Sequence, residues 1–572
     1  MDMRLAVYGL LCEAARTAFP ALKDTDLPGP EALEFPPDSK LGDFAFPCFR
    51  LARPLRLAPD RIAAAIAAAA NQPQLATAQA VGGYVNFFFH RGHFAKAVLE
   101  EISEKGAAYG SQGDQGKTVV LDYSSINIAK RFHIGHLSTT VLGHSLKRIY
   151  THLGWRAIGI NHLGDWGTQF GKMIAAFKRW GDWQMLEAGG VEALNALYVR
   201  FHQEEEKNPA LTEEGRAWFR KIEEGDSEAL SIFNRFKELT LAYAQTVYEQ
   251  LGISFDSYDG EAFFNDKMDR VIEELRQKNL LKPDQGAYVV DLEPYKMPPC
   301  LILKSDGATL YATRDLAAAL WRKDTYGFDQ CLYVVAYQQN LHFKQVFKVL
   351  ELMGYDWAAT QMRHVAFGMV SFEGQAMSTR EGNVVHLDEL LARAVQKARE
   401  IMQVKSPNLA DEEALSLAAR QVGIGAVVFT TLLNNRIKDI DFWWERALNF
   451  DGDTGPYTQY AHARCCSLLA RAGDIQAQPD YAALENDEAQ AVLRLLSRFP
   501  EVITSAMADA EPSYITRATL EVAKAFNKYY YEHRILEGEA GAIAARVLLT
   551  RATREVLALG LYLIGVDAPR QM

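Results

Sequence analysis

Short apolar runs alternate with helical patterns over the central part of the chain. Residues 117–125 (KTVVLDYSS) predict a buried strand followed by a loop, and residues 156–164 (RAIGINHLG) predict a second strand that ends in a glycine turn. Between them, residues 136–153 predict a helix. The same alternation returns at residues 300–322 and 330–355. Such alternation with short glycine-containing joints is typical of a parallel, doubly wound sheet.

Three other regions depart from this alternation. Residues 175–296 carry long, charged helical patterns, which indicate an insertion between two halves of the sheet. Residues 1–113 mix helical patterns with short extended runs, and residues 406–572 are helical. We therefore expect a multidomain α/β protein: an α+β N-terminal domain, a Rossmann-type parallel-sheet domain (114–405) with a helical insertion, and an all-α C-terminal helix bundle.

The overall composition places few limits on function. The 572 residues are 49% hydrophobic and 23% charged, as in soluble globular proteins, and the length suggests roughly three to five domains. The longest apolar stretch is taken to be residues 62–70, shorter than the ~18 residues of a membrane span, and the N-terminus is unlike a signal peptide. The six cysteines include no C-x-x-C pair, which favours reduced thiols. We expect a cytoplasmic protein without a membrane span.

The net charge of −11 bears on the class of partner. A protein that binds polyanions indiscriminately is expected to be basic, so this charge argues against general nucleic-acid binding. Selective binding of one nucleic acid is compatible with it, because binding depends on the local face presented to the phosphates.

A nucleotide-binding pattern follows the first predicted strand, at His133-Ile134-Gly135-His136. Glycine lets a base or ribose pack against the backbone, and the free N–H groups of a helix N-terminus attract phosphate. The two histidines can donate hydrogen bonds to triphosphate oxygens. The motif is short, and a pair of structural histidines that caps the helix is the alternative interpretation.

A second pattern lies far downstream. The apolar run 364–372 is followed by a polar loop, Met377-Ser378-Thr379-Arg380-Glu381-Gly382-Asn383. A loop with hydroxyls and an arginine can close over a pyrophosphate leaving group and stabilise charge that develops in the transition state. Taken alone, a solvent-exposed loop is the simpler interpretation.

Together, the two patterns and the α/β halves between them resemble the paired signatures of class I aminoacyl-tRNA synthetases. The resemblance narrows to the arginyl-tRNA synthetase family through further segments in the same order: Asp122–Lys130, Asn161–Gly171, Tyr311–Asp315, Gln339–Phe343, Asp451–Tyr457 and Tyr460–Arg464. It extends from about residue 40 to the C-terminus. The family implies an enzyme that uses ATP to join arginine to the 3′ end of tRNA(Arg) through an arginyl-adenylate.

An arginine pocket needs carboxylates for the guanidinium group and an acceptor for the α-ammonium group. By resemblance, Tyr311 and Asp315 are expected to contact the guanidinium from one face of a helix. An ion pair of Asp315 with Arg314 or Arg322 at the surface is the alternative. By resemblance, three further residues serve the α-amino and nearby polar groups: Asp122, where the family often has glutamate, Asn127, and Gln339, which is expected to end a strand. His162 is a further candidate for substrate binding.

The resemblance also assigns the ATP site. His133 and His136 are expected to hold the phosphates and Gly135 to pack against the nucleotide. Mg²⁺ is expected to arrive with ATP, so no protein metal site is expected. The catalytic set is completed by Met377, Ser378 and Arg380 of the downstream loop.

Several residues depart from the family pattern. Its loop usually reads K-M-S-K-S, whereas Ala376 and Thr379 occupy the two lysine positions here. Lys130, just upstream of the histidine motif, is the residue expected to compensate. Arg131 replaces a common proline and Ser138-Thr139 replace a usual Arg-Ser, which shifts cations near the ATP site.

The outer domains are expected to contact tRNA. The N-terminal domain resembles the one that contacts the tRNA elbow. Its aromatic residues could stack on a base, although at least half of them are expected in the core: Phe44, Phe46, Phe49 and Tyr84. The C-terminal bundle resembles an anticodon-binding domain, with candidate contacts from Tyr457, Tyr460, His462, Arg464, Asn527 and Tyr530.

Further expectations concern specificity and assembly. A carboxylate-lined pocket rejects other amino acids without an editing domain, so the insertion is expected to be structural or to contact the tRNA stem. The family typically needs bound tRNA before it forms the adenylate, and a monomer is expected. Two alternatives stay open: another class I synthetase or HIGH-type nucleotidyltransferase, and a catalytically silent paralogue that binds tRNA or senses arginine.

Overall fold

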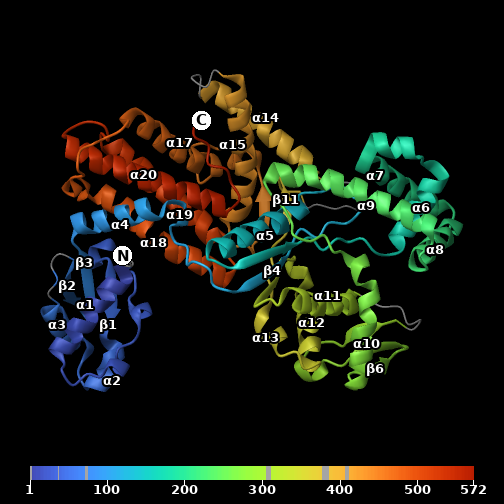
Figure 1. The fold of residues 1–572 in the computed structure, drawn as a ribbon, viewed down its shortest axis with the longest axis horizontal. Helices are drawn as coiled ribbons and strands as arrows, with labels where there is room; N and C mark the ends of the chain where they lie inside the picture. Colours follow the sequence, from blue (N-terminus) through green and yellow to red (C-terminus); the bar gives the residue numbers. More distant parts are fainter. Residues whose placement is uncertain are drawn as a thin grey trace. The chain divides into compact units, whose positions relative to one another are not determined.

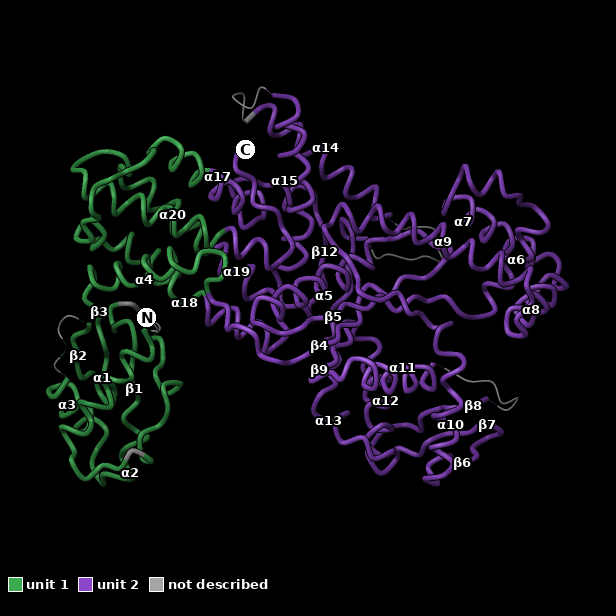
Figure 2. The backbone as a smooth tube through the Cα atoms, viewed as in Figure 1, with its two compact units in different colours: residues 1–109, 464–499, 521–557 green, residues 110–463, 500–520, 558–572 purple. Residues whose placement is uncertain are grey.

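The structure is a computed structural model that describes residues 3–36, 38–70, 72, 75–304, 311–375, 385–405 and 411–572. The chain forms two compact units, shown in different colours in Figure 2. The first unit comprises residues 1–109, 464–499 and 521–557. The second unit comprises residues 110–463, 500–520 and 558–572.

The second unit is built on a parallel sheet of strand order β10-β9-β4-β5. Its strands are β4 (Thr118–Asp122), β5 (Arg156–Ile160), β9 (Gln330–Tyr333) and β10 (Met362–His364), which confirms the predicted strands within 117–125 and 156–164. After β4 the chain adds β5 on one side and later β9 on the other, so the strand order reverses beside β4. Ligands of open α/β sheets bind beyond the carboxyl ends of the strands at such a point.

Apolar side chains of the sheet and its helices form one core. α5 (Gly135–His152) follows β4 as predicted. Val120, Ile158 and Cys331 of the sheet pack with side chains of three further helices: α10 (Met268–Gln277), α11 (Tyr311–Tyr326) and α12 (Asn340–Leu352). Each large buried apolar side chain contributes about 1.5–3 kcal/mol, so these helices are held firmly beside the carboxyl edge of the sheet.

The insertion between β5 and β9 begins with four helices, α6 (Thr168–Trp180), α7 (Trp183–Lys207), α8 (Ala210–Glu223) and α9 (Ser227–Leu251). α6 and α8 cross closely, because a Cβ on Gly171 would lie 2.0 Å from the carbonyl oxygen of Gly215. α7 is interrupted at Gly190, whose φ of 54° is a conformation that favours glycine. α9 runs from this helical group back toward the centre of the second unit (Figure 1).

The last part of the expected helical insertion contains strands instead. β6 (Leu281–Asp284) and β7 (Ala287–Val290) form a hairpin, and β7 pairs on its other side with β8 (Cys300–Leu303). Gln285 and Gly286 form the turn with φ values of 46° and 84°. The structure therefore differs from the purely helical pattern expected for residues 175–296.

The remaining elements of this unit include one strongly apolar helix. They are α13 (Trp357–Gln361), β11 (Val370–Phe372), α14 (Leu387–Lys405), α15 (Glu412–Leu433), β12 (Ile440–Phe442) and α16 (Trp444–Ala447). α15 is long and apolar enough to cross a membrane, but 72% of its apolar stretch is buried inside the protein. It is not an uninterrupted apolar run, because Arg420 and Gln421 lie within it. The burial is that of a core helix.

The first unit begins with an α+β fold, as predicted. An antiparallel sheet of order β1-β3-β2 is formed by β1 (Phe44–Pro47), β2 (Ala76–Val81) and β3 (Tyr84–Phe89). The helices of this part are α1 (Met3–Ala18), α2 (Ala52–Leu55), α3 (Pro59–Ala69) and α4 (Arg91–Lys105). Leu11, Phe46 and Ile62 are among the residues of its buried core.

The C-terminal part is all-α, which confirms the third part of the predicted fold class. Its helices are α17 (Gly455–Ala472), α18 (Asp487–Asp509), α19 (Ser513–Glu532) and α20 (Ala540–Leu563). Each of these helices contributes residues to both compact units. The limits 1–113, 114–405 and 406–572 stay a prediction.

Candidate active site

The loop between β4 and α5 has an unusual backbone. Three of its non-glycine residues have positive φ values: 72° at Ser124, 46° at Ser125 and 64° at Ala129. Left-handed backbone costs a non-glycine residue on the order of 1–3 kcal/mol, and it persists only where surrounding structure enforces it. We call residues 123–134 the nucleotide loop.

Helix α9 of the insertion holds the nucleotide loop in this shape. The backbone N–H of Ala129 donates a 3.0 Å hydrogen bond to Oγ1 of Thr240. The hydroxyls of Ser124 and Tyr248 lie 2.8 Å apart, and Nδ2 of Asn161 donates to the same tyrosine hydroxyl at 2.7 Å. Thr240 is fully buried. The insertion is thus part of the support of the candidate ATP site, a role that no local sequence pattern indicates.

The HIGH motif lies at the start of α5. The rings of His133 and His136 have centroids 3.9 Å apart. The N–H of Gly135 donates to Nδ1 of His133 at 3.1 Å, and the N–H of His133 donates to Nδ1 of His136 at 3.3 Å. A Cβ on Gly135 would lie 2.8 Å from the His133 ring, so glycine permits this packing. His133 thus accepts a hydrogen bond from the first residue of α5, whereas His136 accepts one from a residue that precedes the helix. The structural alternative, in which both histidines cap the helix, therefore applies to His133 alone.

Both histidines are held in the neutral form. Burial, together with the neighbouring His386 and Lys130, lowers the pKa of His133 to about 4. Burial and the neighbouring His133 lower the pKa of His136 to about 3. Because each Nδ1 accepts a backbone hydrogen bond, the neutral ring carries its proton on Nε2, which is the tautomer that can donate to a phosphate oxygen.

The chain that follows the downstream loop lies against the HIGH motif. The N–H of Ile134 donates to the carbonyl oxygen of Val385 at 3.0 Å, and the N–H of Leu387 donates to the carbonyl oxygen of Phe132 at 3.0 Å. The predicted loop residues lie outside the described residues: Met377, Ser378 and Arg380, with Ala376 and Thr379. Backbone pairing thus joins the region of the HIGH motif to Val385 and Leu387, which follow the downstream loop in the chain.

Arg131, which replaces a common proline of the family, has three acidic partners within the chain. Its Nη2 lies 2.8 Å from Asp388 and 3.0 Å from Glu389, at the start of α14, and its Nε lies 3.5 Å from Glu192 of α7. Burial alone would lower the pKa of Arg131, but hydrogen bonding to Asp388 raises it above its usual value. Arg131 therefore links the nucleotide loop to two helices.

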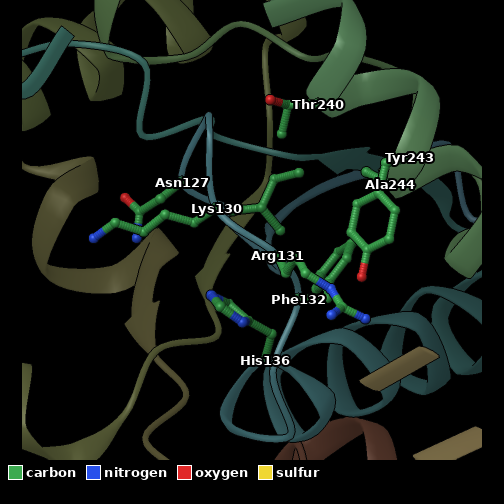
Figure 3. Close-up of a pocket in the computed structure, with 9 residues that line it drawn as sticks. Asn127, Lys130, Arg131, Phe132, His136, Thr240, Tyr243 and Ala244 are labelled. Atoms are coloured by element: carbon green, nitrogen blue, oxygen red, sulfur yellow. The ribbon is translucent and has the colours of Figure 1, made fainter. Parts of the chain in front are cut away.

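A small pocket of about 200 Å³, open space included, lies beside the nucleotide loop. Figure 3 shows Asn127 and Lys130 extending to one side of this loop, while Arg131 extends to the other side near Tyr243. The lining residues are Ile126, Asn127, Lys130, Arg131, Phe132, His136, Thr240, Tyr243 and Ala244. Two predicted site residues, Asn127 and Lys130, are thus exposed on the same side of the nucleotide loop.

Asp122 already has partners within the chain. Its Oδ2 lies 2.8 Å from Nη2 of Arg322, which is almost fully buried, and its Oδ1 accepts a 2.9 Å hydrogen bond from Ser125. Nδ1 of His162 lies 3.4 Å from the same guanidinium and 3.1 Å from the carbonyl oxygen of Asp259. Asp122 and His162 are thereby brought together through Arg322, and their direct contact with substrate stays a prediction.

Replacing Arg322 by methionine is expected to destabilise the protein by about 3–5 kcal/mol, because it leaves the Asp122 carboxylate buried without its counter-charge. Urea unfolding followed by tryptophan fluorescence measures this. Arg270→Met is the control, since Arg270 forms an exposed ion pair with Asp324 and its loss is expected to cost less than about 1 kcal/mol. Equal destabilisation by the two variants would contradict the importance of the buried pair.

Asp315 lies on α11, four residues after Tyr311, as predicted. Its Oδ2 is 2.5 Å from Nε2 of His342 on α12. Burial alone would raise the pKa of Asp315, but hydrogen bonding to His342 holds it below the usual value. The alternative pairing with Arg314 or Arg322 is wrong, because Arg314 lies 3.6 Å from Glu261 and Arg322 pairs with Asp122.

Tyr311 and Gln339 are accessible. Tyr311 is the first residue of α11 and its side chain is 68% exposed. Gln339 does not end a strand, which corrects the prediction: β9 ends at Tyr333, and Gln339 closes a short 3-10 turn before α12. Val334, Val335 and Ala336 separate the strand from this turn.

Glu261 is a candidate that the sequence analysis missed. It opens a 3-10 turn, Glu261–Lys267, between α9 and α10. Burial raises its pKa to about 7; the Arg314 charge opposes this shift, whereas Asp315 and Asp165 add to it. A buried carboxyl that is coupled to the predicted guanidinium-binding Asp315 is a candidate functional group. It lies about fifty residues upstream in the sequence, where no local pattern points to it.

Three of the predicted tRNA contacts meet in the first unit. The guanidinium of Arg464 hydrogen-bonds to Oδ1 of Asn527 and lies 4.7 Å from the ring centroid of Tyr530. Tyr460 is 40% exposed and Tyr457 is half-buried, both on α17. His462 is buried and donates to the carbonyl oxygen of Pro569 at 2.9 Å, so its ring is not available for base stacking. Stacking of His462 on a base is therefore not supported, and a hydrogen bond from it to tRNA stays a prediction.

The aromatic candidates of the N-terminal domain divide evenly. Phe44 and Phe46 are buried in the core, whereas Phe49 is 55% and Tyr84 37% exposed. The exposed pair packs edge to face with centroids 5.5 Å apart. The expectation that at least half of the four belong to the core is confirmed.

No group of three or more His, Cys, Asp or Glu side chains that could hold a metal is found among the described residues. The polar groups beside the nucleotide loop are hydrogen-bond donors and cations: the neutral imidazoles of His133 and His136, and Lys130. Such a donor set fits a nucleotide that carries its own divalent ion.

Comparisons with known proteins cover the whole chain. Three family models match it: Arginyl tRNA synthetase N terminal domain at residues 13–89, tRNA synthetases class I (R), catalytic domain at 98–444, and DALR anticodon binding domain at 458–572. The arginine–tRNA ligase of Alkaliphilus metalliredigens is 50% identical over 95% of this chain and 96% of its own length. That of Clostridioides difficile is 49% identical over 94% and 95%.

Solved structures agree. The arginyl-tRNA synthetase of Thermus thermophilus is 26% identical, with a TM-score of 0.83 and complete coverage of both chains. The Plasmodium falciparum arginyl-tRNA synthetase, 19% identical, has the same fold with a TM-score of 0.81 over 100% of this chain and 99% of its own. One family model matches more than half of the chain, and a curated relative is 50% identical over 95% of it. The chain therefore belongs to the class I arginyl-tRNA synthetases.

Proposed function

We propose that this protein attaches arginine to the 3′ end of tRNA(Arg) in an ATP-dependent reaction that passes through an arginyl-adenylate. Membership of the family supports the ligase activity. The observation that carries the assignment to this chain's own residues is the cluster at the end of β4. Asp122, which ends this strand and precedes the nucleotide loop, pairs with Arg322, and Arg322 in turn contacts His162. The charges of both Asp122 and Asp315 act on His162.

His133 and His136 bind the triphosphate of ATP. Their Nε2–H groups donate hydrogen bonds to phosphate oxygens, and the N-terminus of α5 adds its helix dipole. Lys130 supplies the positive charge that the two missing loop lysines would otherwise supply. Mg²⁺ enters with ATP and supplies additional charge neutralisation.

Arginine binds with its guanidinium toward Asp315 and Tyr311. A bidentate carboxylate contact suits the planar guanidinium and discriminates against side chains that cannot donate in the same geometry. Glu261 supplies a second carboxylate. Asn127 and Gln339 bind the α-amino end, while Asp122 acts on it through Arg322 and Ser125.

The chemistry requires no side-chain nucleophile. An oxygen of the arginine carboxylate attacks the α-phosphorus of ATP, the bond to the β-phosphate oxygen breaks, and pyrophosphate leaves. A ribose hydroxyl of the terminal adenosine of tRNA then attacks the arginyl carbonyl carbon, loses its proton and expels AMP. Positioning and charge stabilisation by the protein lower the barrier to both steps.

Arginine binding is expected to strengthen as the pH rises through about 7. Glu261, whose pKa is raised to about 7, is protonated below this pH and must lose its proton to bind a guanidinium. The KM for arginine is therefore expected to fall several-fold between pH 6 and 8. Measuring this KM in parent and Glu261→Gln proteins checks it, since the variant should lose the pH dependence. A parallel pH dependence in both would remove Glu261 from the pocket.

The tRNA contacts are proposed in two places. Phe49 and Tyr84 offer an exposed aromatic pair for a base at the tRNA elbow, and Arg464, Asn527 and Tyr530 offer a cluster for anticodon bases. Bound tRNA is expected to complete the site for adenylate formation. We further propose a monomeric, cytoplasmic enzyme.

Charging of tRNA with labelled arginine tests the proposed function. The protein should form acid-precipitable arginyl-tRNA that depends on ATP, and should not charge other amino acids. Charging by a different amino acid would favour another class I synthetase. Tight tRNA binding without any charging would favour the silent paralogue.

A further inference from the structure

Lys130 makes a contact that its proposed role does not explain. Its ammonium nitrogen lies 5.4 Å from the ring centroid of Tyr198, within the ~6 Å range of a cation–π interaction. Tyr198 is half-buried on α7, in the helical insertion. The contact therefore joins the lysine of the nucleotide loop to a helix nearly seventy residues later in the chain.

The same helix also contacts the next residue of the loop. Glu192 of α7 lies 3.5 Å from Nε of Arg131. Arg131 and Lys130 extend to opposite sides of the loop (Figure 3). Helix α7 thus has an acceptor for each of two consecutive cations, an acidic side chain for one and an aromatic ring for the other.

The backbone at the root of Lys130 is fixed independently. Ala129 has a φ of 64° and donates its N–H to Thr240 of α9. The direction in which Lys130 leaves the loop is therefore set, whereas its flexible four-carbon side chain has many rotamers. Restricting such a side chain costs on the order of 1.5–2 kcal/mol in rotamer entropy, so a partner that limits its range favours one position of the ammonium group.

The ring of Tyr198 is itself held in place. It packs edge to face on His202 with centroids 4.5 Å apart, and Nδ1 of His202 lies 3.2 Å from Glu205. Glu205 in turn pairs with Lys172 of α6 at 2.7 Å. The ring thus belongs to a side-chain network of the insertion rather than to a mobile surface side chain.

We propose that Tyr198 is a positioning residue for Lys130, through which the insertion helix α7 orients the cation that the ATP site uses in place of the missing loop lysines. The proposal rests on the proposed role of Lys130. Tyr198 acts through its ring face and not through its hydroxyl. Its loss therefore impairs ATP use and leaves arginine recognition, which depends on α11 and α12, unchanged.

Steady-state ATP–pyrophosphate exchange with tRNA present, at varied ATP and varied arginine, tests the proposal. Tyr198→Leu is expected to lower kcat/KM for ATP about three- to tenfold, as loss of a cation–π contact implies, without changing the KM for arginine. Tyr198→Phe, which keeps the ring, should match the parent. Trp180→Leu is the structural control, because it removes a ring that lies 4.6 Å from the guanidinium carbon of Arg200 within the same insertion.

A double-mutant cycle with Lys130→Met separates the possible failures. The proposal requires that Tyr198→Leu cause no further loss once Lys130 is methionine. An undiminished loss in that background, or an equal loss in Trp180→Leu, would mean that Tyr198 only stabilises the insertion. If Lys130→Met alone left exchange unchanged, the proposed role of Lys130 would fall and this inference with it, while arginine-dependent exchange itself would stand.

Discussion

Asp315→Asn is expected to lower kcat/KM for arginine by about 100- to 1,000-fold, mainly through KM. The variant keeps the shape of the side chain but removes the charge that pairs with the substrate guanidinium. Truncating one partner of a buried, charged hydrogen bond costs on the order of 2–5 kcal/mol. Arginine-dependent ATP–pyrophosphate exchange measures the effect. His342, which binds Asp315 at 2.5 Å, keeps its partner atom in the variant.

A matched control lies on the same helix. Asp324 is exposed and pairs with Arg270 at 2.7 Å, so Asp324→Asn should leave kcat/KM within about twofold of the parent. Inhibition by citrulline, an uncharged analogue of arginine, gives a second readout. Its affinity relative to arginine should rise in Asp315→Asn. An unchanged preference for arginine over citrulline would show that Asp315 does not read the guanidinium.

His136→Ala is expected to lower kcat by about 100- to 1,000-fold with less effect on the KM for arginine, because it removes a donor aimed at charge that develops in the transition state. His136 is half-buried and neutral, and its Nδ1 accepts a hydrogen bond from the backbone N–H of His133. His136→Gln, which can place an N–H near the position of Nε2, should retain more activity than His136→Ala.

His152→Ala is the control for this prediction, because His152 lies at the other end of α5. Thermal unfolding of all three variants shows whether any loss of activity reflects loss of folding. Activity that falls only in proportion to stability would contradict a direct role of His136 in catalysis.

The sequence predicted those parts of the site in which chemistry and local pattern coincide. His133, Gly135 and His136 follow a strand and open a helix, so their placement depends on neighbours in the chain. Tyr311 and Asp315 share a helix, and their spacing alone puts them on one face. Such arrangements are encoded within a few residues.

Long-range contacts account for the features that the sequence did not predict. The insertion contributes three side chains to the site: Thr240, Tyr248 and Glu261. Its sequence indicates only charged helices. Arg322 reaches Asp122 across 200 positions of sequence. The partners of these side chains are determined by how the elements pack, which hydrophobic periodicity does not specify.

One local error has a physical reason as well. The β6–β7 hairpin carries a Gln285-Gly286 turn, but β6 contains Lys282, Pro283 and Asp284, which are unfavourable in a strand and obscured the signal. Most of the apolar stretch of α15 is buried inside the protein, which explains its apolar composition. A helix that spans a membrane can have the same composition. Composition alone does not distinguish the two environments.

The most direct test of the account is ATP–pyrophosphate exchange with each amino acid in turn, in the presence and absence of tRNA(Arg). Exchange is expected with arginine alone among the amino acids, and only when the tRNA is present. Exchange with another amino acid would contradict the arginine pocket at Asp315. No exchange under either condition, with tRNA still bound, would contradict catalysis itself and make the two missing loop lysines the decisive feature of the chain.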